Sequence, residues 1–257
     1  MKMITFIGAG VACAAMGGVL LAQDVTTDSA GPQAAQVFRA SGASAADIQD
    51  TVDDYRDALG TLNPNVPGSF PNGRREINWD GVPDALSAPN DLPPDFFNTT
   101  SPRGAVFFSP GNAFQVSANA GVGPIEFDNL NPGFSALFTT FSPQRLFTAL
   151  TSDAGALNAR TEILFFEPGS TRQATTSGFG VVFTDVDGKN AKVEFLDISG
   201  RVLWSGFAPK ATGNETLSFL GVKFQGNPVY LVRITLKVAQ DAIVMDDFIY
   251  GEPQPVH

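Results

Sequence analysis

The chain has 257 residues, of which 43% are hydrophobic and 16% are charged, and its 22 phenylalanines can fill a sizeable core. Its 26 acidic and 16 basic residues give a net charge of −10. Because nucleic acid and anionic lipid repel a polyanion of this kind, we expect neither as a partner.

Residues 1–22 are predicted to be a secretory signal peptide. Lys2 supplies a basic start, the stretch from Ile4 to Leu21 is apolar, and Ala22 is a small residue at the expected cleavage point. The apolar run is nearly long enough to span a bilayer, so an uncleaved anchor is the alternative. Cleavage would leave 15 basic and 26 acidic residues, a net charge of −11. We therefore expect a secreted, extracellular or cell-surface protein with no membrane span after signal removal.

Residues 23–73 are predicted to form an N-terminal extension with one amphipathic helix. Residues 24–46 are small and polar, and we expect most of them to be loose. Ser44 and Asp47 form a capping-box pattern, in which the acid reaches back to a free N–H group. Apolar residues then recur at helical spacing: Ile48, Val52, Tyr55 and Leu59. We predict a helix at about residues 47–60, whose apolar face must dock on the β-domain or on a partner.

Residues 74–252 are predicted to form one β-domain, followed by a tail at 253–257. Short runs with a period of two are separated by Gly, Pro and Asn, and two turns, 197–200 and 226–228, are typical of hairpins. The predicted strands are 75–79, 105–109, 113–118, 125–130, 135–141, 161–167, 178–185, 192–198, 201–207, 216–224, 229–238 and 242–250. Strands without intervening long helices favour a mostly-β fold, an antiparallel jelly-roll-type β-sandwich with a short N-terminal helical extension.

Carboxylates gather where predicted strands end. Strand alternation places Asp185 and Asp187 on one side, and Glu126 and Asp128 repeat this i, i+2 spacing. In the last predicted strand two acids are adjacent, so one of them must face the apolar side of the sheet: Asp246 and Asp247.

A buried carboxylate is costly unless it is hydrogen-bonded, paired or metal-bound. Oxygen-only clusters near Gly and Asn favour calcium, which accepts six to eight oxygen ligands in flexible loops. All six acids are therefore candidate calcium ligands. The alternative is that they are ordinary solvated acids of turns and strand ends.

The residue types behind common catalytic mechanisms are scarce. The single cysteine, Cys13, lies in the predicted signal, and the single histidine, His257, is the last residue. Ser-His-Asp and Cys-His mechanisms and histidine-based zinc sites are thereby excluded. Any catalysis would depend on carboxylates, lysine, tyrosine or a bound metal, so the sequence argues against an enzyme.

Aromatic side chains that could stack on a glycan are also few. Trp204 lies in an apolar predicted strand and is expected in the core. Trp79 stands beside Asp80 and Gly81 in a loop-rich region, so of the two tryptophans it is the better candidate for exposure, and we propose it as a ligand-binding residue.

Three segments, 179–187, 218–222 and 244–252, resemble an uncharacterised group of secreted bacterial proteins. Members of that group are regarded as jelly-roll, lectin-like modules, and some carry a C-terminal surface-sorting tail. The resemblance covers about residues 74–252 and implies a non-catalytic extracellular or surface module, without an established ligand. This chain departs from the group because residues 252–257 contain no apolar sorting segment.

Three functions stay open. The favoured one is a secreted non-catalytic binding or structural module, which could be stabilised by calcium and could bind a glycan or another surface protein. A carboxylate-based glycoside hydrolase is the second, because i, i+2 acids can approach the ~5–5.5 Å separation of retaining enzymes. The third is a self-assembling surface or matrix protein, which would use the helix or an edge strand.

Overall fold

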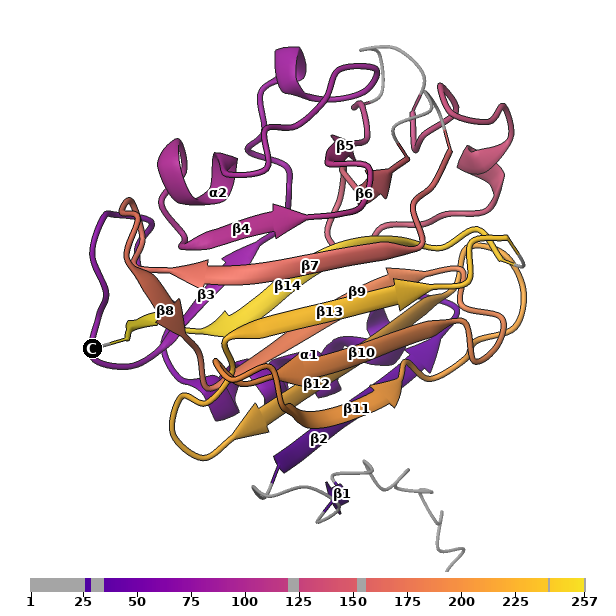
Figure 1. The fold of residues 1–257 in the computed structure, drawn as a ribbon. Helices are drawn as coiled ribbons and strands as arrows, with labels where there is room; N and C mark the ends of the chain where they lie inside the picture. Colours follow the sequence, from indigo (N-terminus) through magenta and orange to yellow (C-terminus); the bar gives the residue numbers. More distant parts are fainter. Residues whose placement is uncertain (1–25, 29–34, 120–124, 152–155, 240, 257) are drawn as a thin grey trace, which may run out of the picture.

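A computed structural model describes residues 26–28, 35–119, 125–151, 156–239 and 241–256. These residues form two β-sheets packed face to face (Figure 1), in which the named strands pair antiparallel. Helix is limited, within these ranges, to two α-helices and two 3-10 turns. The predicted β-sandwich with a helix near the N-terminus is therefore confirmed.

The first sheet has eight strands, in the order β1 (Thr26–Asp28), β2 (Ala35–Gly42), β12 (Leu217–Phe224), β9 (Gly178–Thr184), β14 (Val244–Gly251), β6 (Phe147–Leu150) and β5 (Ala113–Val116), with β3 (Arg74–Ile77) added to β14. The second has seven, in the order β11 (Val202–Phe207), β10 (Ala191–Leu196), β13 (Leu231–Leu236), β7 (Arg160–Phe166), β8 (Gln173–Thr175) and β15 (Gln254–Pro255), with β4 (Ala105–Phe108) added to β7. The helical segments are α1 (Ala45–Leu59), α2 (Phe96–Thr99), η1 (Asp84–Leu86) and η2 (Phe134–Ala136). None of the helices in the described ranges is long and apolar enough to cross a membrane.

The two predicted hairpin turns have different outcomes. The turn at 197–200 joins β10 to β11, which pair with each other, so it is a hairpin. The turn at 226–228 joins β12 to β13, which lie in different sheets. Because β2 and β9 occupy both edges of β12, β13 finds no free edge there and crosses to pair with β10 and β7.

Several strand predictions were also wrong. Residues 125–130 and 135–141 form turns and a 3-10 segment, although Phe127 and Phe138 are buried in a small separate hydrophobic cluster. Residues 35–42, expected to be loose, form β2 and pair with β12 along its whole length. The sandwich therefore includes part of the predicted N-terminal extension, because a partner far along the chain supplies the hydrogen bonds.

Helix α1 docks on its own domain, on the outer face of the first sheet. Its capping box is present, and the Ser44 N–H donates to the Asp47 carboxylate over 2.9 Å. The predicted apolar stripe is buried against side chains from β2, β9, β12 and β14: Phe38, Val182, Phe219 and Ile249. The central strands of this sheet thus bury both faces, one in the sandwich core and one under α1.

Two facing glycines make room for the helix. Gly180 of β9 pairs with Gly221 of β12, and the ring of Tyr55 lies over both. A Cβ atom added at Gly180 would lie 2.6 Å from the Tyr55 ring, and one at Gly221 would lie 2.8 Å from it. The Tyr55 hydroxyl also donates to the main-chain oxygen of Val222 over 3.2 Å.

We predict that Gly180→Ala destabilises the fold by about 1–3 kcal/mol, because the added methyl group overpacks the contact with Tyr55. Gly81→Ala is the matched control, since a Cβ at Gly81 meets nothing within 4 Å. Urea unfolding measures the free energy of each variant, and limited proteolysis within α1 reports whether the helix has loosened. Equal stability of the two variants would contradict the proposed packing.

Candidate functional site

The six acids identified in the sequence do not form one site. Asp246 and Asp247 lie in the middle of β14, beside α1. The other four lie on or next to the loops around the C-terminal end of β9 and the N-terminal end of β12. The two groups have different surroundings and are described separately.

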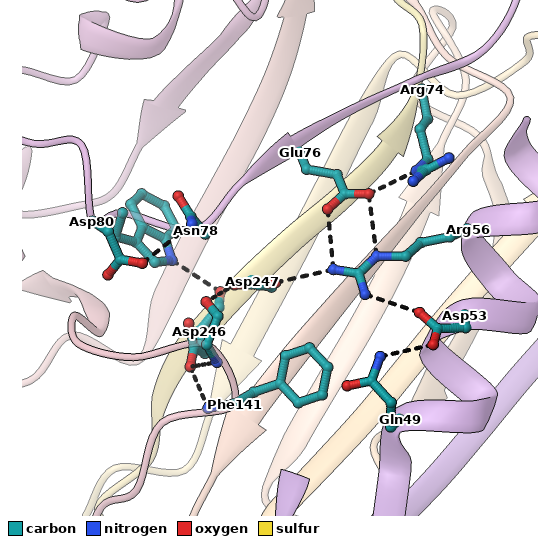
Figure 2. A network of polar contacts seen from close by, with 12 residues as sticks. Gln49, Asp53, Arg56, Arg74, Glu76, Asn78, Asp80, Phe141, Asp246 and Asp247 are labelled. Atoms are coloured by element: carbon teal, nitrogen blue, oxygen red, sulfur yellow. Dashed lines mark hydrogen bonds and ion pairs between the residues drawn. The ribbon is translucent and has the colours of Figure 1, made fainter. Parts of the chain in front are cut away.

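The β14 acids are hydrogen-bonded inside the protein (Figure 2). They lie at a register shift where β14 meets β9. The Asp246 carboxylate accepts from the N–H groups of Phe141 at 2.6 Å and Ser142 at 3.2 Å. The Asp247 carboxylate accepts from the Ser142 hydroxyl at 2.6 Å and lies 3.4 Å from the Arg56 guanidinium.

Burial governs the protonation of this pair. Desolvation, with the neighbouring charge of Asp247 as the next cause, raises the pKa of Asp246 well above its usual value. Desolvation also raises the pKa of Asp247, to about 6, although Ser142 and Arg56 act in the opposite direction. Raised pKa values are a feature of catalytic acids, but these side chains are 0% and 2% exposed. Their burial leaves no access for a substrate, and the charge of Arg56 disfavours a cation, so the surroundings favour a structural role. One oxygen of Asp246, Oδ1, has no hydrogen-bond partner among the described residues.

Arg56 ties α1 to β3 and β14. Its guanidinium binds Glu76 through two hydrogen bonds of 3.1 and 3.0 Å and Asp53 through one of 3.0 Å (Figure 2). Glu76 also accepts from Arg74 over 2.6 Å. Sequence reasoning missed this network because Arg56 is separated from Glu76 by 20 positions and from Asp247 by 191.

The remaining acids, with two more, surround one end of the sandwich. We call the following set the acidic loop end: Glu126, Asp128, Asp185, Asp187, Glu215 and Asp241. The loop 208–216 links its members, because the Gly213 N–H donates to Asp187 over 3.0 Å. Asp241 accepts from the Asp187 N–H, also over 3.0 Å. Asp241 was not predicted, since it is a single acid in a turn and is 54 positions from Asp187.

Asp185 is the most unusual member of the acidic loop end. It is 4% exposed and has a φ angle of 66°, in the left-handed region that non-glycine residues rarely adopt. Its Oδ1 atom has no hydrogen-bond partner among the described residues. Burial, followed by the charges of Asp241 and Asp187, raises the pKa of Asp185 to about 7. Backbone strain and an unsatisfied buried oxygen together point to a functional position.

Glu126 and Asp128 have different roles. Asp128 accepts from the N–H groups of Gly133 and Ser135 and from the Ser135 hydroxyl, which lowers its pKa and organises its own loop. Glu126 is half-buried and lines a pocket of about 290 Å³. Burial, followed by the charges of Glu215 and Asp128, raises the pKa of Glu126. Asp128 therefore has the hydrogen bonds of an ordinary turn acid, whereas Glu126 lines a pocket.

The oxygen-only chemistry of Asp185, Asp187 and Asp241 matches what calcium prefers. In the part of the chain that the structure describes, however, no group of three or more His, Cys, Asp or Glu side chains is arranged to hold a metal ion. A bound calcium ion would therefore need main-chain carbonyls or water molecules in addition to these carboxylates.

The expectation that Trp79 is exposed was wrong. Its side chain is 1% exposed and stacks on Phe147, with ring centroids 4.2 Å apart. Its indole N–H donates to the main-chain oxygen of Asp246 over 3.0 Å. The neighbouring turn residues suggested a surface position, but the sandwich core extends to this loop, so Trp79 is unsuited to stacking on a ligand.

A scan of the chain against models of protein families found no match. Searches of curated proteins and of solved structures found none either. The function is therefore inferred from the residues and their geometry.

We predict that the pH dependence of stability will identify the buried β14 pair. Because the folded-state pKa values of both acids are raised, their contribution to stability is fully present at low pH. It is lost as the pH rises from about 4 through the folded-state pKa values. Asp246→Asn keeps an oxygen that can accept the Phe141 N–H but cannot ionise. Its stability relative to wild type should increase by up to about 1.4 kcal/mol per pH unit.

Urea unfolding of both proteins between about pH 4 and pH 8 measures this difference. Asp54→Asn is the control, because Asp54 is exposed on α1 and its side chain makes no hydrogen bond with the described residues. The difference in the free energy of unfolding between Asp54→Asn and wild type should vary little with pH. If the corresponding difference for Asp246→Asn also varies little with pH, the buried pair is not held in a protonated form.

Proposed function

We propose that the chain is an exported, non-catalytic binding or structural module whose acidic loop end is stabilised by calcium. The observation that carries this proposal is the environment of Asp185. A buried carboxylate with a strained backbone, an unpartnered oxygen and two acidic neighbours is costly in the absence of a counter-charge. A divalent cation would supply that counter-charge.

The neighbouring acids support calcium over other cations. One oxygen of Asp187 and one of Asp241 accept main-chain N–H groups, which orients each carboxylate while its second oxygen stays available. Calcium tolerates such mixed ligand sets of carboxylates, carbonyls and water. Magnesium should act more weakly, because it demands octahedral geometry and holds its water molecules more tightly.

The two alternatives have less support. A glycoside hydrolase needs a pair of carboxyl groups that a sugar can reach, whereas the adjacent pair with raised pKa values, Asp246 and Asp247, is buried beside α1. A self-assembling protein could have used the apolar face of the helix. That face is buried on the chain's own first sheet, so it offers no surface to a partner.

The calcium proposal predicts a change in thermal stability. A ligand that binds only the folded state adds about 2.7 kcal/mol when its free concentration is a hundred times Kd. For a domain of this size that corresponds to a rise in Tm of roughly 5–10 °C in calcium relative to chelator. Differential scanning calorimetry measures the shift, and magnesium should give a smaller one.

Three variants locate the effect. Asp187→Asn and Asp241→Asn should each remove most of the calcium-dependent rise. Asp54→Asn on α1 removes the same charge from an exposed position and should leave the rise intact. Identical melting curves in calcium and chelator, together with no metal by elemental analysis, would refute the calcium proposal.

A further inference from the structure

We propose that a second pocket, at the opposite end of the sandwich, binds a sugar residue that carries a carboxylate. Strand β12 begins next to Glu215 of the acidic loop end and ends at Phe224, where this pocket lies. The pocket has a volume of about 320 Å³. Polar side chains from separate segments of the chain line it: Asn72, Ser177, Lys223, Gln225, Asn227 and Gln254.

The acid that lines the pocket is already neutralised by an arginine. Glu252 lines the pocket, but its carboxylate is bound by the Arg75 guanidinium over 2.7 and 2.8 Å, and both side chains are buried. The same carboxylate accepts from the Asn63 amide over 2.8 Å and from the Phe70 N–H over 3.2 Å. Glu252 is thus fully engaged, and its charge is cancelled by Arg75.

Several polar side chains at the rim of the pocket make no hydrogen bond within the protein. Within the described ranges, the side chains of Asn72, Ser177, Gln225 and Asn227 make no hydrogen bond. Amide and hydroxyl groups both donate and accept hydrogen bonds, and the hydroxyl groups of a sugar do the same. Such a rim therefore suits a polyhydroxylated ligand better than an apolar one.

Lys223 determines the charge of the ligand. It lines the pocket, and no carboxylate in the described part of the chain lies within ion-pair distance of it. An unpaired lysine beside a neutralised acid attracts one negative charge, although the whole chain has a net charge of −10. A uronic acid combines one carboxylate with several hydroxyl groups, which matches Lys223 and the amide rim.

The size of the pocket limits the ligand and its affinity. A volume of about 320 Å³ is near the lower end of the range for ligand pockets, so it suits one sugar residue. Phe224 lines the pocket but is 1% exposed, so it offers no stacking surface. Binding would depend on hydrogen bonds and one charge, and we expect a Kd on the order of 1 mM.

This inference assigns a ligand class to the proposed binding role, and it rests on that role. It does not depend on any acid of the acidic loop end. NMR titration of the ¹⁵N-labelled chain with glucuronate, glucose and acetate, in calcium and in chelator, tests it. We expect saturable shifts around residues 72–73, 177 and 223–227, with glucuronate binding at least tenfold more tightly than glucose or acetate. Uronate binding without a calcium response would refute the calcium proposal alone. A calcium response without uronate binding would refute this inference alone.

Matched variants make the test specific. Lys223→Met should weaken glucuronate binding about tenfold or more, and Asn227→Ala should weaken it severalfold. Lys210→Met is the control, because Lys210 is an exposed lysine on the loop 208–216 at the other end of β12. Three outcomes would overturn the inference: no shifts at these residues, equal binding of acetate and glucuronate, or equal effects of Lys223→Met and Lys210→Met.

Discussion

Several carboxylates are buried in this sandwich, although the chain has ten more acidic than basic residues. A buried charge is tolerated when it is paired and hydrogen-bonded. Arg75 neutralises Glu252 beneath the C-terminal segment, and Arg56 binds Glu76 and Asp247 between α1 and the first sheet. These two arginines connect segments that are far apart in the chain, so the same contacts that neutralise acids also fasten the helix and the C-terminal segment to the sandwich.

Asp185 is the exception to this pattern. Asp246 also has one oxygen, Oδ1, without a partner among the described residues, but its other oxygen accepts two main-chain N–H groups. The Asp185 carboxylate, by contrast, accepts no hydrogen bond from the described residues. The position of Asp185 explains the difference. Asp185 directly follows the fully buried strand β9 and begins a loop that contacts other acids. The same strand begins at the polar pocket that contains Ser177 and Lys223. The sandwich thus presents polar loops at both ends, acidic at one and carrying an unpaired lysine at the other.

Local patterns predicted the elements whose stabilising contacts are close in sequence. Helix α1 could be predicted because its capping box and its apolar spacing lie within the helix, and most strands could be predicted from their period of two. The predictions that failed concerned contacts between residues that are far apart in the sequence. Alternation was the argument for placing Asp185 and Asp187 on one side, but β9 ends at Thr184 and Asp185 has a left-handed backbone, so strand alternation does not extend to these acids. Nor could it show that Asp247 contacts Arg56 of α1 or that Asp241 joins the loop. The burial of Trp79 could not be predicted either, because Phe147 and β14 cover it from remote positions.

Whether Asp185 binds an external cation is tested most directly by a crystal structure determined with calcium and with anomalous diffraction data. We predict an anomalous peak with Asp185, and with Asp187 or Asp241, as oxygen ligands at about 2.3–2.6 Å. We also expect the Asp185 backbone to keep its left-handed conformation around the ion. A structure in which Asp185 turns to solvent, or accepts a hydrogen bond from the protein, with no ion beside it would show that Asp185 needs no cation.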